Sequence, residues 1–270
     1  MSEKLTGIPE TLLVSLWARA AASEEKDPII QDDKAREMVA DIEYDFARFE
    51  KSRLTRLGVA VRTMLLDRAL RGLFAEHPEV VVINFGAGLD TRHARLGCHD
   101  IPWYEIDVPE TIDLRRRFFT ETGTYKFIAQ SMFDLSWADA VDTRGRQVLF
   151  LAEGLLMYFS ETEVKSFFRD LAERFPGAEM VFEMLPPFLV GRSRQHESLR
   201  KMEKPPEFKW GLGNCRDMEG WHPGIRYVRE WDYYDYHKSR WGLFGVVGRL
   251  PFVRPKLSSR IVHLRFTEAA

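Results

Sequence analysis

The chain has 270 residues, and its 39 Lys and Arg residues nearly balance its 41 Asp and Glu residues, for a formal net charge of −2. This balance excludes a general attraction to nucleic acid or to an anionic membrane, although it leaves room for a local basic patch. With 45% hydrophobic and 30% charged residues, the composition is typical of a globular protein, and the length suits one large α/β domain.

Particular residues disfavour several further classes of protein. Cys98 and Cys215 form neither a disulfide framework nor a metal-ligand spacing, and the histidines fall in no ligand spacing. Residues Met1–Lys4 lack the start of a signal peptide, and no stretch approaches the roughly 20 apolar residues of a membrane span. We therefore expect a reduced, cytoplasmic protein with no metal, no nucleic-acid partner and no membrane partner.

The chain opens with helices. Apolar residues recur at helical spacing over residues 9–22, and a second helix is predicted over residues 33–42. Residues 44–49 then lead into a third helix, which is clearest over residues 59–76. Since all three precede the first strand, they form an N-terminal helical addition to a sheet.

Arg62 is unusual in the third helix because it lies four residues before Leu66, on the apolar stripe that Leu66, Leu70 and Leu73 form. A guanidinium group on a core-facing line needs an anionic or carbonyl partner. The alternatives are an ordinary ion pair and a packed stem whose charged end reaches water.

The central feature is the run from Val80 to Phe85, which ends at the turn Gly86-Ala87-Gly88. An unbroken run of β-branched residues predicts a parallel strand buried on both faces. The glycines allow a tight turn and a close approach of another group to the backbone. In α/β sheets, a strand that ends in such a turn is the usual place for a nucleotide-like ligand.

Asp107 closes a second strand, predicted over residues 101–107, and a helix starts at Pro109 and ends near Gly123. The separation from the first glycine is 107 − 86 = 21 residues. In Rossmann-like sheets, an acidic residue at this place and spacing binds the ribose hydroxyls. The alternative is that Asp107 only helps to cap the next helix.

Two more acidic residues follow predicted strands. Asp134 comes after a strand over residues 125–129, where it could accept a hydrogen bond from an adenine amino group or serve as an ordinary turn residue. Glu153 closes a strand over residues 147–152, where an unpaired carboxylate would be costly, so we expect it to face a wet cleft or to be paired.

The rest of the sheet is less regular. Ser160 and Glu163 predict a capping box that starts a helix, and the fifth strand spans residues 178–184. Residues 186–222 read as an insert of helix and loop; its cations form either a solvated face or a lid over a cleft. They are Arg192, Arg194, Arg200, Lys201, Lys204 and Lys209. Residues 225–231 and 260–266 look like two last strands that pair as a hairpin.

The turn does not fit a dinucleotide. Thr91 replaces the third glycine of the dinucleotide fingerprint, and Asp90 would repel a pyrophosphate. A ligand with a cationic amino-acid end, such as S-adenosylmethionine, fits better. From the residues alone, Asp90 suits its ammonium, Arg62 its carboxylate, Asp107 its ribose and Asp134 its adenine.

Several segments resemble the leucine carboxyl methyltransferase family, and most closely its bacterial branch of polyketide O-methyltransferases. The likeness is carried by residues 84–92 with Arg95-Leu96, by residues 104–110, by residues 152–158 and by Ala18-Arg19-Ala20. It extends over about residues 10–185.

This resemblance implies a Rossmann-like class I methyltransferase fold that depends on S-adenosylmethionine. Its sheet would have seven strands, mostly parallel, with a reversed C-terminal hairpin, an N-terminal helical addition and an insert after strand five. We expect one domain over residues 1–270, in four parts: a helical cap at 1–58, a cofactor-binding core at 59–185, an insert or lid at 186–222 and C-terminal strands at 223–270.

Matched residue by residue, the resemblance gives each candidate a role. It implies that Arg62 binds the methionine carboxylate and that Glu153 binds the amino group, which makes Asp90 a loop-shaping neighbour. The other expected cofactor contacts are Gly86 with Ala87 and Gly88 at the cofactor backbone, Asp107 at the ribose, and Asp134 with Leu135 at the adenine.

The expected reaction is methyl transfer to an oxygen of a small acceptor, aromatic or polyketide-like. A carboxylate acceptor is already ionised at pH 7 and needs only an orienting donor, for which Arg19, Tyr158 and the insert are candidates. A phenol would need a base, and Glu153 is the nearest, so carboxyl methylation is favoured. Aromatic residues that could line the acceptor pocket are Trp210, Trp221, Trp231, Tyr233, Tyr234 and Trp241.

Two other functions are kept as alternatives. The first is an NAD(P)-dependent oxidoreductase, which would need the third glycine and a general acid. The second is a non-catalytic interaction protein that retains the fold.

Overall fold

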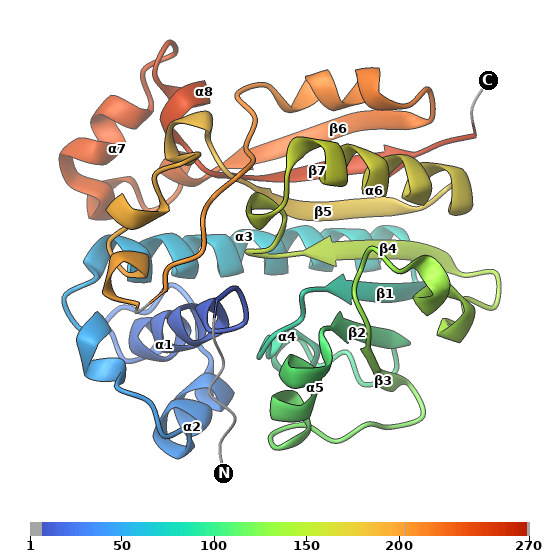
Figure 1. The fold of residues 1–270 in the computed structure, drawn as a ribbon, viewed down its shortest axis with the longest axis horizontal. Helices are drawn as coiled ribbons and strands as arrows, with labels where there is room; N and C mark the ends of the chain where they lie inside the picture. Colours follow the sequence, from blue (N-terminus) through green and yellow to red (C-terminus); the bar gives the residue numbers. More distant parts are fainter. Residues whose placement is uncertain (1–6, 203, 269–270) are drawn as a thin grey trace.

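The computed structural model describes residues 7–202 and 204–268. Its centre is a seven-stranded sheet with the strand order β3-β2-β1-β4-β5-β7-β6 (Figure 1). The first five strands are parallel, and β7 runs antiparallel to both of its neighbours. This is the predicted seven-stranded, mostly parallel sheet with a reversed C-terminal hairpin. The strands are β1 (Val80–Phe85), β2 (Trp103–Asp107), β3 (Tyr125–Ala129), β4 (Gln147–Ala152), β5 (Glu179–Met184), β6 (Ile225–Asp232) and β7 (Arg260–Phe266).

Helices cover both faces of this sheet (Figure 1). The α-helices are α1 (Thr11–Ser23), α2 (Asp33–Asp41), α3 (Arg53–Glu76), α4 (Arg92–Arg95), α5 (Pro109–Arg116), α6 (Glu161–Arg174), α7 (Gly242–Gly248) and α8 (Arg254–Leu257). The 3-10 helices are η1 (Phe46–Phe49), η2 (Leu135–Ala140), η3 (Leu156–Tyr158), η4 (Pro187–Leu189), η5 (Ser193–Gln195), η6 (Leu199–Lys201), η7 (Cys215–Trp221), η8 (Tyr233–Asp235) and η9 (Lys238–Trp241).

Strand β1 is buried along its whole length, as its sequence predicts. Alternate side chains point to opposite faces of a strand, so Val81 and Ile83 enter the core on the α6 side, whereas Val80 and Val82 enter the core on the α3 side. Burying such a side chain stabilises the fold by roughly 1.5–3 kcal/mol. The turn that follows β1 therefore starts from a fixed position.

The helix α1 lies over the turn that follows β1. Its residues Leu13, Leu16 and Ala20 pack in one cluster with Met38 of α2 and with Leu89 of the turn. The N-terminal helical addition is therefore in direct contact with the edge of the sheet where ligands of α/β proteins bind.

Several predicted boundaries were wrong by a few residues. The third helix starts at Arg53 instead of residue 59, and the helix after Pro109 stops at Arg116 instead of near Gly123. The predicted capping box of α6 is present, with Ser160 and Glu163 bonded reciprocally. The insert after β5, predicted as helix and loop, consists of loops and short 3-10 helices.

The largest unpredicted feature lies between β6 and β7. The two strands pair, but residues 233–259 separate them and carry α7 and α8. None of the helices in residues 7–202 and 204–268 is long and apolar enough to cross a membrane. The predicted lack of a signal peptide concerns Met1–Lys4, which lie outside the described residues.

Candidate functional site

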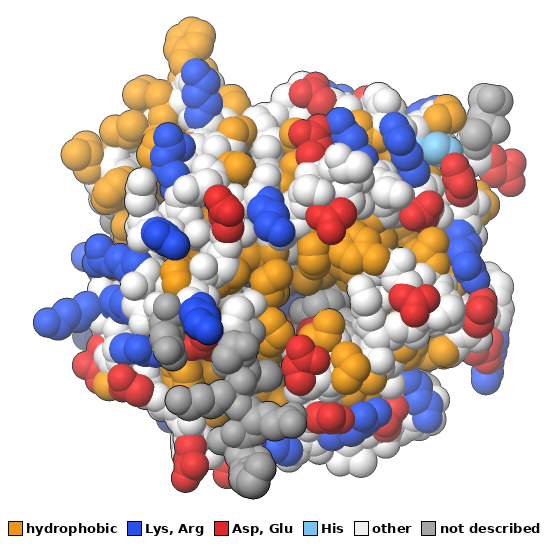
Figure 2. All heavy atoms as spheres, viewed as in Figure 1, with side chains coloured by type: hydrophobic (Ala, Val, Ile, Leu, Met, Phe, Trp, Pro, Cys, Tyr) orange, Lys and Arg blue, Asp and Glu red, His pale blue; other side chains and the backbone are white. Residues whose placement is uncertain are grey.

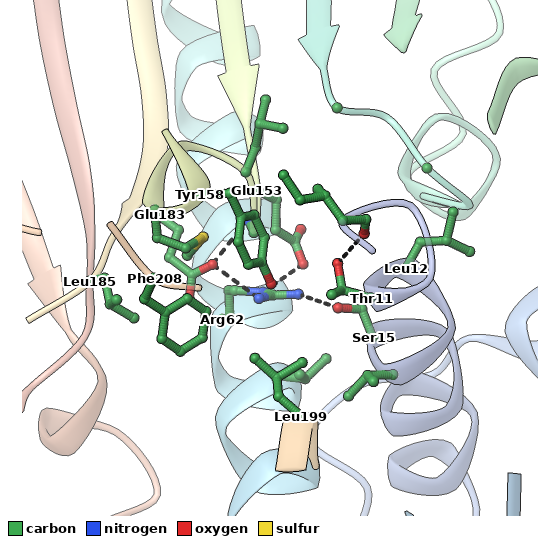
Figure 3. Close-up of a pocket in the computed structure, with 18 of the residues that line it drawn as sticks. Thr11, Leu12, Ser15, Arg62, Glu153, Tyr158, Glu183, Leu185, Leu199 and Phe208 are labelled. Atoms are coloured by element: carbon green, nitrogen blue, oxygen red, sulfur yellow. Dashed lines mark hydrogen bonds and ion pairs between the residues drawn. The ribbon is translucent and has the colours of Figure 1, made fainter. Parts of the chain in front are cut away.

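A cavity of about 900 Å³ opens at the carboxyl ends of the parallel strands (Figure 3). One end is formed by the turn after β1, the end of β2 and the segment after β4, including Gly86, Asp107 and Glu153. The other end is formed by α1, the insert and residues that follow β6. Side chains far apart in the sequence thus line one continuous space.

The glycine turn is fixed by the end of β2. Gly86 has a φ of +62°, and a Cβ atom there would lie 2.7 Å from Cδ1 of Leu155, so a larger residue fits neither the backbone nor the space. The carboxylate of Asp107 accepts hydrogen bonds from the N–H of Gly88 at 2.8 Å and from the N–H of Val108 at 2.8 Å. Asp107 therefore holds the turn instead of capping α5, whose N-cap residue is Val108.

The same turn is held from its carbonyl side by Arg115, which is fully buried. Its guanidinium donates to the carbonyl oxygens of Gly88 and Asp90, each at 2.9 Å, and to Glu105 at 2.6 Å. Burial raises the pKa of Asp107, and the N–H donors of Gly88 and Val108 offset part of this rise.

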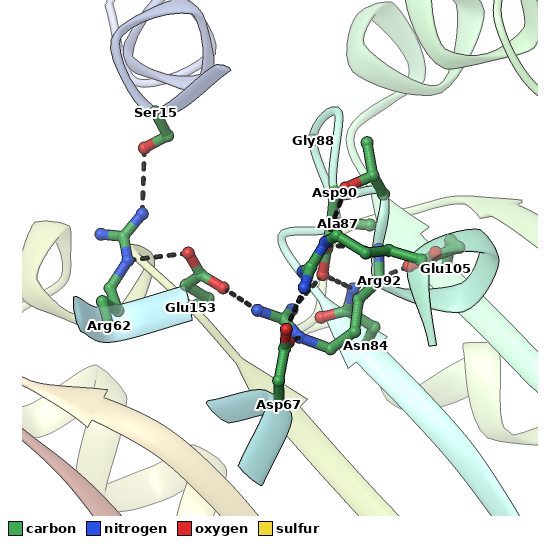
Figure 4. Close-up of polar contacts among 12 residues, drawn as sticks. Ser15, Arg62, Asp67, Asn84, Ala87, Gly88, Asp90, Arg92, Glu105 and Glu153 are labelled. Atoms are coloured by element: carbon green, nitrogen blue, oxygen red, sulfur yellow. Dashed lines mark hydrogen bonds and ion pairs between the residues drawn. The ribbon is translucent and has the colours of Figure 1, made fainter. Parts of the chain in front are cut away.

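Glu153 is both paired and at the wall of the cavity (Figure 4). One carboxylate oxygen accepts from Nε of Arg62 at 2.7 Å, and the other accepts from Nη2 of Arg92 at 2.5 Å. Burial by itself would raise the pKa of Glu153, but the two guanidinium groups outweigh it and hold the pKa well below its usual range. Glu153 therefore presents a permanent negative charge to the cavity.

Arg62 connects α3, on which it lies, to α1, to β5 and to the segment after β4. Besides Glu153, it donates to Glu183 of β5 at 3.0 Å and to the hydroxyl of Ser15 in α1 at 3.1 Å (Figure 3). Glu183 also accepts from the phenol of Tyr233 at 2.8 Å. The ion-pair interpretation of Arg62 is therefore correct here, and these bonds use three of its five N–H donors.

Arg92, which the sequence analysis missed, is the centre of a second set of ion pairs (Figure 4). It is 1% exposed and contacts Glu153, Asp67 at 2.8 Å, and Asp90. Asp90 also accepts from the N–H of Arg92 and from the amide of Asn84. These are the contacts of a loop-shaping residue, the role that the family resemblance implies for Asp90.

Arg19 connects α1 to the glycine turn. It donates to Asp32 at 2.8 Å and to the carbonyl oxygen of Leu89 at 2.7 Å, while Asp32 accepts in turn from the hydroxyl of Thr91. Arg19 also lines the cavity, but these contacts give it the role of holding the turn. That it orients an acceptor stays a prediction.

Tyr158 of η3 is buried at the same cavity, with its ring 5.6 Å from that of Phe208 (Figure 3). Burial raises the pKa of its phenol to about 12, so the hydroxyl remains a hydrogen-bond donor at neutral pH. Phe208, Leu185 and Leu199 make this end of the cavity apolar.

His196 also lines the apolar end and was missed by the sequence analysis, because its spacing fits no motif. Its Nδ1 accepts from the N–H of Leu199 at 3.4 Å, which leaves Nε2 as the protonated nitrogen of the neutral ring. Burial lowers the pKa of His196 to about 4, so the ring is neutral at pH 7.

The predicted adenine residues lie elsewhere. Asp134 is exposed, and its carboxylate accepts from the N–H of Ser136 at 3.2 Å and from its hydroxyl at 2.9 Å. Among the described residues, this side of the cavity is lined by Gln130, Ser131 and Met132, not by Asp134 or Leu135. The turn interpretation of Asp134 is thus the one that its contacts support.

Three of the six aromatic residues predicted for an acceptor pocket line the cavity. Tyr233, Tyr234 and Trp241 are at the cavity, whereas Trp210 and Trp221 pack in the core against α6. Within residues 7–202 and 204–268, no group of three or more His, Cys, Asp or Glu residues could hold a metal ion.

Comparison with known proteins adds independent information. Residues 12–172 match the leucine carboxyl methyltransferase family. The chain is 33% identical over 233 residues to the tetracenomycin polyketide synthesis O-methyltransferase TcmP of Streptomyces glaucescens. The alignment covers 86% of this chain and 85% of that protein.

A second relative is the S-adenosyl-L-methionine-dependent methyltransferase dpfgK of Gibberella zeae, 30% identical over 265 residues, with 89% of this chain and 87% of that protein covered. Among solved structures, a DUF574 family protein from Streptomyces avermitilis matches with a TM-score of 0.58 at 15% identity, over 93% of this chain and 96% of that chain. At this identity the structural match concerns the fold alone. These relatives support neither an oxidoreductase nor a non-catalytic protein.

Proposed function

Since this chain belongs to the leucine carboxyl methyltransferase family, we propose that it methylates the carboxylate of a small aromatic or polyketide-like acceptor. The chain is an S-adenosylmethionine-dependent O-methyltransferase. The observation that carries the proposal is one continuous cavity at the ends of the parallel strands, with fixed charges at one end and an apolar, aromatic wall at the other.

The charged end suits the cofactor. Gly86, with a φ of +62°, shapes the turn that lines this end, Glu153 offers a permanent negative charge for an ammonium, and two N–H donors of Arg62 remain for a carboxylate. When bound, S-adenosylmethionine supplies an electrophilic methyl group on a sulfonium. The other proposed cofactor contacts are Ala87, Gly88, Asp90 as the loop-shaping neighbour, and Asp107 at the ribose. Asp134 and Leu135 do not line the cavity, and their contact with the adenine stays a prediction from the sequence.

The apolar end suits the acceptor. Aligning an acceptor oxygen with the methyl group and excluding water can lower the barrier by roughly 7–11 kcal/mol. We propose that the phenol of Tyr158 and the Nε2–H of His196 orient the acceptor carboxylate, since both groups are donors at neutral pH. Arg19 remains a candidate for the same role.

The ionisable groups at the cavity favour a carboxylate over a phenol. A phenol with an ordinary pKa of about 10 must lose its proton before or during transfer. His196, with a pKa of about 4, and Glu153, with a pKa held still lower, are both poor bases for this step. A carboxylate needs no base, so it is the acceptor that these groups can serve.

The nature of the product tests this proposal. The purified enzyme is incubated with labelled methyl donor and two panels of aromatic acceptors, one of carboxylic acids and one of phenols without a carboxyl group. We expect label in methyl esters, which mild alkali hydrolyses to methanol. Label retained after alkali, as in an aryl methyl ether, would contradict carboxyl methylation.

Tyr158→Phe provides a matched variant for this assay. We expect its kcat/KM for the acid to fall by about tenfold, because one hydrogen bond to a charged group is lost. Binding of S-adenosylhomocysteine, measured by calorimetry, should stay unchanged.

The organisation of the chain completes the proposal. We propose one domain with a helical cap at 1–58, a cofactor-binding core at 59–185, an insert or lid at 186–222 and C-terminal strands at 223–270. The free thiols of the buried Cys98 and Cys215 support a cytoplasmic location.

A further inference from the structure

Helix α7 is packed with its large apolar side chains outward. Gly245 and Gly248 are buried, and a Cβ atom on them would lie 2.5 Å from Cβ of Trp241 and 2.3 Å from Cε2 of Tyr234. The glycine face thus fits closely against the protein, which turns the bulky face of the helix to solvent. A surface helix of a globular protein normally has the opposite arrangement.

The outward residues continue beyond α7 and form what we call the α7–α8 patch. Figure 2 shows hydrophobic side chains gathered at the upper left, over the position of α7 and α8 in Figure 1, and projecting from the surface. The patch consists of Leu243 (76% exposed), Phe244 (63%), Val246 (55%), Val247 (38%), Leu250 (50%) and Phe252 (90%). Contiguous apolar surface of this kind marks an interaction site, whereas single exposed residues do not.

The segment that carries this patch has charges of one sign. From Tyr236 to Thr267 the sequence contains no Asp or Glu, but several cations. Arg240 and Arg254 form ion pairs with acidic residues of other segments. Two exposed cations remain without a salt-bridge partner among the residues that the structure describes: Lys238 of η9 and Lys256 of α8.

The patch also borders the mouth of the cavity. Phe244 of α7 and Leu257 of α8 line the cavity, as does Trp241, on which Gly245 packs. An apolar molecule that leaves a hydrophobic phase at the patch would therefore meet the acceptor end of the cavity first.

We propose that the α7–α8 patch docks this protein on an anionic lipid surface. Aromatic and aliphatic side chains that project beyond flanking Lys and Arg residues are the features of interfacial membrane segments. A second copy of the chain fits less well, because a symmetric contact would place the same cations opposite one another. The expectation of no membrane contact rested on the net charge of the whole chain. That sum does not show that one short segment carries cations and no carboxylates.

The test is flotation of the full-length protein with vesicles, which does not depend on the proposed reaction. We expect the protein to bind vesicles of phosphatidylcholine with phosphatidylglycerol, more weakly at high salt, and to bind pure phosphatidylcholine vesicles less. Leu243→Asn combined with Phe252→Asn should lower binding at least about tenfold, because the buried apolar area is lost. Both residues lie outside the cavity lining, so S-adenosylhomocysteine binding should persist and confirm the fold.

A pair of charge variants separates electrostatics from general effects. Lys238→Glu with Lys256→Glu should weaken binding, whereas Arg71→Glu with Lys126→Glu, which makes the same change in net charge on other exposed elements, should not.

Three results would overturn the proposal. They are no binding of the wild-type protein to anionic vesicles, unchanged binding of the Leu243/Phe252 variant, and a wild-type dimer without vesicle binding that this variant converts to a monomer. The last result would assign the patch to a second copy of the chain.

Discussion

At one end of the cavity, charged side chains from α3, α4, β5 and the segment after β4 are fixed by reciprocal ion pairs, whereas at the other end apolar side chains come from 3-10 turns and loops. Arg62, Glu153 and Arg92 each bond at least two partners and are almost completely buried. The side chains of Phe208 and Leu199 are held by apolar packing, and hydrogen bonds with Thr55 connect the turn that carries Leu199 to α3. A substitution at the charged end therefore disturbs several partners at once, whereas a substitution at the apolar end changes only local packing.

This difference matches the two reactants. The cofactor is the same in every turnover, and rigid strand ends with interlocked charges can hold it in one geometry. An acceptor is selected by shape and apolar contact, and irregular segments can change without disturbing the sheet. The following predictions test how independent the two ends are.

The largest effect is expected for Arg92→Met. It would leave the carboxylates of Asp67, Asp90 and Glu153 without their shared partner, so the free energy of unfolding should fall by about 3–5 kcal/mol. Urea denaturation measures this. The control Arg144→Met removes an exposed pair with Asp142 and should leave the urea midpoint nearly unchanged. Similar losses in both variants would refute the special role of the network.

Asp107→Ala should weaken S-adenosylhomocysteine binding by about 10- to 100-fold, because a hydrogen-bonded carboxylate is lost at the glycine turn. Calorimetry measures the dissociation constant. Asp113→Ala, an exposed change on the next helix, is the matched control. An unchanged dissociation constant for Asp107→Ala would remove the ribose assignment.

Phe208→Leu should act on the acceptor end alone. We expect kcat/KM for the acceptor to fall by about three- to tenfold, because part of an apolar wall is lost, while cofactor affinity stays the same. Initial rates at saturating cofactor measure the first quantity and calorimetry the second. If both fell together, the two ends would not be independent.

The pH dependence of stability should show a smaller effect from His196. Its pKa of about 4 in the folded protein lies below the ordinary value of 6.5, so the unfolded chain binds the proton more readily between these values. Stability is therefore complete above pH 6.5 and declines as the pH falls toward 4. His196→Gln should flatten this decline, and urea midpoints at several pH values would reveal it. Identical slopes for both proteins would show that His196 titrates normally.

The smallest effect is expected for Asp134→Ala. If its exposed carboxylate bonds the adenine, the dissociation constant of S-adenosylhomocysteine should rise by about threefold, because an exposed hydrogen bond contributes little. Calorimetry alongside Asp139→Ala, another exposed residue of the same segment, measures the difference. Equal constants for these two variants would leave Asp134 as a turn residue only.

Local signals in the sequence predicted the structural elements around the glycine turn well. The apolar run of β1, the glycine turn and the capping box at Ser160 depend on residues close in sequence, and all three are present. The candidates Arg62 and Glu153 were found because each places a charge where burial is expected. Their partners were not predicted, because 91 residues separate these two and spacing carries no information across such a distance.

The acceptor end was harder to predict for a physical reason. His196 and Phe208 lie in 3-10 turns and loops, where no periodicity distinguishes buried residues from exposed ones. The orientation of helix α7 is also hard to predict, because its glycines are buried and its large apolar residues are exposed. Hydrophobicity alone would assign the opposite orientation.

The contacts that Asp107 and Arg115 make with the glycine turn have a consequence for protein engineering. Asp107 bonds its N–H side and Arg115 its carbonyl side, and both come from the β2–α5 unit that follows it. The conformation of the turn therefore depends on two residues that lie later in the sequence. A chimaera that exchanges the segment around Gly86 between relatives should keep its shape only if the exchanged piece extends through Arg115, which makes residues 80–115 the smallest transplantable unit of the cofactor end.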